Sequence, residues 1–167
     1  YLVGDSQSGK TWTSLSCFAE ACRNPAFDKY RLIFDDVEGG AMMDWEKFFG
    51  KRVADKVEAP FGDFASENVE EFYYNVDDAI QKESPFIYIL DSMDALSTGE
   101  ETNKFQEQKS AKRKGKETTG TYGTSKAKAN SAGIRQILTG LRKTGSILIV
   151  ISQTRDNIGF GAQFNPK

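Results

Sequence analysis

The residues most able to do chemistry lie near the start of the chain. The octapeptide Gly4–Thr11 (GDSQSGKT) matches the pattern G-x-x-x-x-G-K-[ST] at every fixed position. It follows a short apolar run and opens a helical pattern, which is the context that a phosphate-binding loop requires. In such a loop, backbone N–H groups wrap a phosphate, and the N-terminus of the following helix attracts its charge. The sequence therefore predicts a site for a nucleoside triphosphate.

Single positions of this phosphate-binding loop have distinct expected roles. Lys10 would neutralise the β- and γ-phosphate oxygens, and the Thr11 hydroxyl would be a ligand of Mg²⁺. A second acid for the magnesium is expected at the carboxyl edge of a buried strand, and Asp91 ends the apolar run FIYILD. The predicted nucleotide-binding residues of the loop are Gly4, Asp5, Ser6, Gln7, Ser8, Gly9, Lys10 and Thr11.

Two other apolar runs end in polar side chains that could act on a γ-phosphate. In IFDDVEGG we choose Glu38, over Asp36 and Asp94, as the carboxylate that orients and deprotonates the attacking water. The last run ends at Gln153, whose amide could contact the γ-phosphate and order the following glycine-rich segment according to nucleotide state. From the residues alone, a purely structural turn remains an alternative at both places.

The elements that must position these residues alternate along the chain. Strand-length apolar runs are predicted at 1–3, 30–36, 85–91 and 146–152, with a shorter strand near 56–59. Helical patterns lie between them at 11–22, 42–53, 66–83 (with Ser66 as N-cap) and 129–143. This alternation predicts an α/β fold of one domain, a mostly parallel twisted sheet with helices on both faces.

One long segment, 97–128, has almost no apolar residues and no strong period. Between Lys104 and Lys128 it holds eight Lys or Arg residues against Glu107 and Glu117. We expect a basic, flexible loop, since polar connections of this length are unusual in a compact domain. Basic side chains can follow the phosphates of a single nucleic-acid strand, and an occasional aromatic side chain can stack on a base. The alternative is that the segment is a solvated, flexible insertion.

Composition excludes several classes of protein. The chain has 167 residues, a net charge of −2 and no histidine, so a His-based catalytic dyad and a Cys/His zinc site are excluded. Cys17 and Cys22 are expected to be reduced, buried thiols of a cytoplasmic protein. No run is apolar enough to span a membrane. Because the chain opens inside an apolar run and closes without a finishing element, we expect a core that is incomplete at both ends.

Four sequence blocks together resemble the RecA family of P-loop recombinases. They occur in family order, the last being the most specific: GDSQSGKT, IFDDVEGG, YILDSMDAL and ILIVISQTRDNIGFGAQFNP. The resemblance covers essentially the whole chain, which looks similar to single-domain, phage-type recombinases. It implies a RecA-like ATPase core in the cytoplasm of a bacterial or phage-infected cell, with ATP and Mg²⁺ as cofactors.

The resemblance also implies roles for particular residues. Glu38 would be the catalytic glutamate, Trp45 the aromatic that stacks on adenine, and Gln153 the link from γ-phosphate to a DNA-binding loop. The two DNA-binding loops would be roughly 97–127 and 155–167. The resemblance and the local excess of positive charge together imply the following DNA-binding residues: Lys112, Arg113, Lys114, Lys116, Lys128, Arg135, Arg155 and Ile158. Ile158 would be an apolar wedge between bases. The first loop is longer and more basic than the family pattern, and we expect the family's N-terminal polymerisation segment to be absent from this core.

The function expected from these features is an ATP-dependent, single-stranded DNA-binding recombinase that self-associates into a filament or ring. Its ATP hydrolysis would be stimulated by the DNA. The alternatives are a hexameric helicase-type motor, a small-molecule kinase, and a KaiC-like regulatory ATPase. The third and fourth sequence blocks, YILDSMDAL and ILIVISQTRDNIGFGAQFNP, argue against the helicase. The basic segment and Gln153 argue against the kinase. Glu38 argues against a regulator that does not hydrolyse ATP.

Overall fold

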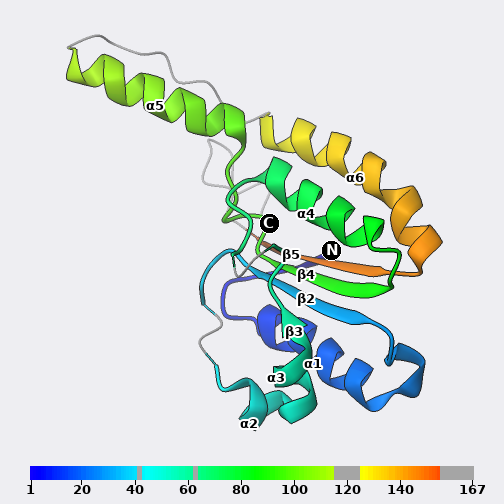
Figure 1. Cartoon of the computed structure of the whole chain (residues 1–167). Coiled ribbons are helices and arrows are strands. Elements are labelled where there is room, and N and C mark those ends of the chain that lie inside the picture. The colour runs from blue at the N-terminus through cyan, green and yellow to red at the C-terminus, as the bar shows by residue number, and fades with distance from the viewer. Residues whose placement is uncertain (41–42, 62–63, 115–124, 155–167) are drawn as a thin grey trace, which may run out of the picture.

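The computed structural model describes residues 1–40, 43–61, 64–114 and 125–154. Within these residues the chain forms a five-stranded, all-parallel sheet of order β1-β5-β4-β2-β3 (Figure 1). Its strands are β1 (Leu2–Gly4), β2 (Arg31–Asp36), β3 (Val57–Glu58), β4 (Phe86–Asp91) and β5 (Ile147–Gln153). The predicted α/β class and the parallel sheet are confirmed.

Helices cover both faces of the sheet. In Figure 1, α4 and α6 lie on one face, and α1 lies on the other with α2 and α3 beside it. The helices are α1 (Lys10–Arg23), α2 (Trp45–Phe49), α3 (Lys51–Lys56), α4 (Val69–Gln81), α5 (Gly99–Arg113) and α6 (Ser125–Thr144), with a short 3-10 turn at Pro25–Phe27. No helix in the described ranges is both long and apolar enough to cross a membrane.

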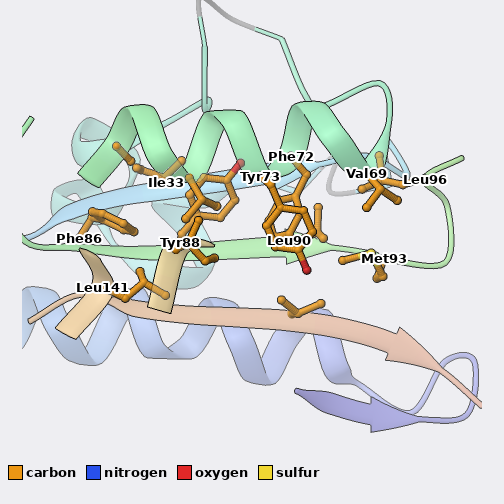
Figure 2. Packing of buried hydrophobic residues seen from close by; sticks show 14 residues of the cluster. Ile33, Val69, Phe72, Tyr73, Phe86, Tyr88, Leu90, Met93, Leu96 and Leu141 are labelled. Atoms are coloured by element: carbon orange, nitrogen blue, oxygen red, sulfur yellow. The ribbon is translucent and has the colours of Figure 1, made fainter. Parts of the chain in front are cut away.

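Strand β4 is the centre of the core because both of its faces are covered. Phe86, Tyr88 and Leu90 point toward α4 and α6, where they meet the aromatic side chains of α4 (Figure 2). Ile87 and Ile89 alternate with them and pack on the opposite side against α1. This two-sided burial explains why the run FIYILD is continuously apolar.

The contact between α4 and α6 depends on a glycine. A Cβ placed on Gly133 would lie 2.3 Å from Cδ2 of Tyr73, whose ring is 5% exposed. We therefore expect Gly133→Ala to destabilise the fold by about 1–3 kcal/mol, although Ala in an open helix would gain about 1 kcal/mol. Urea denaturation measures this, with Ser131→Ala on the exposed side of α6 as control. A midpoint equal to or above the wild-type value would contradict the packing.

The prediction of a loop over 97–128 is wrong for residues 99–113, which form α5, and for residues 125–128, which form the start of α6. Helix α5 begins with a capping box, in which the Thr98 side chain accepts from the Glu101 N–H and the Glu101 carboxylate accepts from the Thr98 N–H. None of its residues is buried, so it has no apolar period to reveal it. In Figure 1 it extends away from the sheet.

Three smaller predictions are also corrected. Asn68, not Ser66, caps α4, because its side chain accepts from the Glu71 N–H and Ser66 instead binds a buried aspartate. The helix expected over 42–53 is broken at Gly50, whose φ of +92° ends α2. Cys17 is exposed rather than buried.

Candidate nucleotide-binding site

The phosphate-binding loop joins the end of β1 to the start of α1. Gly9 takes a φ of +81°, a left-handed conformation that turns the backbone into the helix and that favours glycine. It offers no side chain to cap α1. The N–H groups of the first helical turn are therefore left for a ligand, and the helix dipole favours an anionic one.

Lys10 folds back over the same loop. Its Nζ donates hydrogen bonds to the carbonyl oxygens of Gly4 (2.9 Å) and Asp5 (2.6 Å). The ammonium group is thus held beside the loop's backbone, where a phosphate bound to the loop would meet it. Carbonyl partners of this kind can be exchanged for phosphate oxygens, because the flexible lysine stem needs only a small movement.

Thr11 and Asp91 meet although they lie far apart in the sequence. The Thr11 hydroxyl donates to Oδ2 of Asp91 at 2.5 Å. Burial raises the pKa of Asp91, the hydrogen bond from Thr11 lowers it, and the nearby carboxylates of Glu38 and Asp36 raise it again. A cation at this point would relieve the repulsion among these acids.

Mg²⁺ fits this donor set if protein and phosphate oxygens coordinate it together, rather than protein side chains alone. The described residues contain no cluster of three or more side chains able to hold a metal by themselves. Mg²⁺ is usually held by one or two protein oxygens together with phosphate oxygens and water. Thr11 and Asp91 supply oxygens of that kind at the mouth of the loop.

Glu38 and Gln153, predicted from different parts of the chain, contact each other. The Glu38 Oε1 accepts from the Gln153 side-chain amide at 3.1 Å and from the Ser92 hydroxyl at 2.5 Å. The Glu38 backbone N–H also donates to the Asp91 carbonyl at 3.1 Å. Sequence reasoning missed Ser92, whose only signal is its place directly after Asp91.

Sheet order explains why these groups converge. All strands are parallel, so their carboxyl ends share one edge, and β5 lies between β1 and β4. The register places Gly4 opposite Gln153 and Asp36 opposite Asp91. The phosphate-binding loop, the amide and the acids therefore stand side by side at the edge where ligands of open α/β sheets bind.

Asp94 fixes the strand end that carries Gln153. Its Oδ2 accepts from the Gln153 backbone N–H at 2.7 Å and from the Ser152 hydroxyl at 2.8 Å. Lys126, near the start of α6, donates to the Asp94 carbonyl at 3.3 Å. Asp94 thus ties the end of β5 to the α6 terminus, a role that sequence reasoning missed.

These residues surround a cleft of about 430 Å³. The described residues that line it are Ser6, Gln7, Ser8, Gly9, Lys10, Thr11, Trp12, Asp36, Glu38, Gly40, Met43, Asp91 and Gln153. Trp45, predicted to stack on adenine, is not among them. Its ring packs against Phe34 and Phe49, with centroids 5.5 and 5.8 Å away, as part of the core around α1.

Those predicted DNA-binding residues that the structure describes do not line the cleft. Lys112, Arg113 and Lys114 are exposed at the far end of α5 (Figure 1). Lys128 and Arg135 are exposed on α6. The others, Lys116, Arg155 and Ile158, lie outside the described residues, as does the predicted second loop 155–167.

No family model matches the chain, and no curated protein matches it. The fold and site therefore define the class only coarsely, as an α/β protein with an all-parallel sheet and a polar cleft at its carboxyl edge. Such a sheet is compatible with both Rossmann-like and RecA-like folds. A finer assignment rests on the chemistry of the cleft.

Proposed function

We propose that this chain is a RecA-like ATPase core that binds single-stranded DNA and acts in recombination. The observation that carries the proposal is the meeting of Glu38 and Gln153 beside the Thr11–Asp91 pair. It supplies a base and a γ-phosphate sensor at the edge where the loop would hold a triphosphate. ATP and Mg²⁺ are the proposed ligands.

Each group has a separate task in this proposal. The loop N–H groups and Lys10 bind the phosphates, while Thr11 and Asp91 hold Mg²⁺, which when bound would neutralise charge on the phosphate oxygens. Glu38 orients the attacking water and accepts its proton. Its exposed carboxylate can reach a water in the open cleft.

The Glu38–Gln153 contact also offers a way to sense hydrolysis. A γ-phosphate that accepts a hydrogen bond from the Gln153 amide would compete with Glu38 Oε1 for the same donor. The position of Gln153 would then differ between the ATP and ADP forms. Through Asp94, the end of β5 is tied to the start of α6, so the difference can reach α6 and its exposed cations.

Single-stranded DNA and a second copy of the chain are the proposed partners. The exposed cations at the end of α5 and along α6 can contact phosphates of a DNA strand. Assembly into a filament or ring would place these surfaces in a row along one strand. The remaining surface is acidic overall, which keeps nucleic acid on the cationic segments.

The direct test is the rate of ATP hydrolysis by the full chain with and without single-stranded DNA. We expect Mg²⁺-dependent hydrolysis that rises when DNA is added. Equal rates in both conditions at saturating ATP would contradict the recombinase. Turnover that needs a small acceptor molecule instead would favour a kinase.

Neutralising the end of α5 should change the salt dependence of DNA binding. We expect replacement of Lys112, Arg113 and Lys114 by Ala to weaken binding of single-stranded DNA and to reduce the slope of log K against log salt by about 0.7 for each lost phosphate contact. Fluorescence anisotropy across a salt series measures the slope. The matched control removes three exposed lysines outside α5 and α6, Lys29, Lys51 and Lys82. An identical slope in both triple variants would show that α5 does not contact DNA.

A further inference from the structure

The cleft has an apolar side that phosphate chemistry does not use. Among the described residues that line it, Trp12 and Met43 alone have large apolar side chains. Trp12 is 48% exposed, a large aromatic surface left in contact with solvent. A flat apolar surface in an otherwise polar cleft suits a ligand with an anionic end and an aromatic end.

The position of Trp12 fits the second end of such a ligand. It directly follows Thr11 and is the third residue of α1. Side chains in a helix lean toward its N-terminus, so the indole lies over the turn that faces the phosphate-binding loop. In a nucleotide, a single sugar separates the phosphates from the base, so a base can reach this ring while the loop holds the phosphates.

The indole is held in place before any ligand arrives. Its centroid lies 5.4 Å from that of Phe48, with the rings nearly perpendicular, and 4.9 Å from that of Phe49. Both phenylalanines belong to α2, so the ring is fixed between two elements. Trp45 differs, since its ring packs on Phe34 and Phe49 and it is not a cleft-lining residue.

We propose that Trp12 is the platform on which the nucleobase stacks. The inference rests on the proposed function, because a base arrives only if the loop holds the phosphates. Stacking depends on ring area rather than on the hydrogen-bonding edge of a base. We therefore expect purine nucleotides to bind more tightly than pyrimidine nucleotides, with little discrimination between adenine and guanine by this contact.

The test compares two ligands that share phosphates and differ in the base. Binding of ATP and of inorganic tripolyphosphate, both with Mg²⁺, is measured by calorimetry on the wild-type chain and on Trp12→Ala. We expect Trp12→Ala to weaken ATP roughly tenfold and to leave tripolyphosphate unchanged. Equal losses for both ligands, or no loss for ATP, would overturn the inference.

Tryptophan fluorescence gives an independent readout, because the chain has two tryptophans. Trp45→Phe leaves Trp12 as the emitter, and Trp12→Phe leaves Trp45. We expect ATP to quench the first variant and not the second, and tripolyphosphate to quench neither. Quenching confined to Trp12→Phe would place the base at Trp45 and overturn the inference. A wild-type chain that binds neither ligand would refute the proposed function itself, and the platform with it.

Discussion

Replacing Glu38 with glutamine is expected to slow ATP hydrolysis by about 10²- to 10⁴-fold, the usual contribution of a positioned general base. Glutamine keeps the size of the side chain and can still accept from Ser92 and Gln153, so the cleft should keep its shape. It cannot take a proton from water. Single-turnover hydrolysis measures the rate, and equilibrium binding of ATP should change little.

Asp36→Asn is the matched control for Glu38→Gln. Asp36 also lines the cleft and lies on the same strand end, but its Oδ1 accepts from the Gly40 N–H at 3.2 Å. We expect this variant to retain most of the hydrolysis rate. A large loss in Asp36→Asn with a normal rate in Glu38→Gln would show that the base had been wrongly chosen.

Replacing Asp35 with alanine is expected to destabilise the fold by about 3 kcal/mol or more. This carboxylate is fully buried at the end of β2 and accepts from the Ser66 N–H (2.8 Å), the Ser66 hydroxyl (2.6 Å) and the Tyr88 hydroxyl (2.7 Å). Burial raises the pKa of Asp35 above its usual value, and these hydrogen bonds offset only part of that rise. Without the carboxylate, buried donors lose their acceptor.

Urea denaturation measures the loss of unfolding free energy, and two further variants serve as comparisons. Tyr88→Phe removes one donor and should cost about 1 kcal/mol. Asp55→Ala removes an exposed aspartate that pairs with Lys51 and should stay within about 0.5 kcal/mol of wild type. If Asp35→Ala unfolds at the same urea concentration as Asp55→Ala, the buried network does not stabilise the strand end that leads to Glu38.

The strands and the phosphate-binding loop were predictable because their signals are local. Continuous apolar runs mark strands buried on two faces, as for β4. The closeness of Thr11 and Asp91 followed from one rule, that parallel strands end at the same edge. In the same way, the strand ends at Glu38 and Gln153 could be expected near the loop without knowledge of side-chain contacts.

Other features depend on information that a local pattern does not contain. Helix α5 has no buried face, so only the Thr98–Glu101 cap marks its start. Trp12 and Trp45 both fall in helical patterns and both contact Phe49, and only the tertiary fold shows that Trp12 lines the cleft while Trp45 packs on Phe34. Asp94 contacts Ser152 and Gln153 on β5, far along the chain, and nothing in its neighbourhood indicates this.

In the proposed function, the bound nucleotide controls DNA binding through Gln153. The most direct measurement is the affinity of Glu38→Gln for single-stranded DNA with ATP and with ADP, at one salt concentration, since slow hydrolysis preserves the ATP form. We predict tighter binding with ATP, and loss of the difference when Gln153→Ala is added. Equal affinities with ATP and ADP in Glu38→Gln would contradict the account.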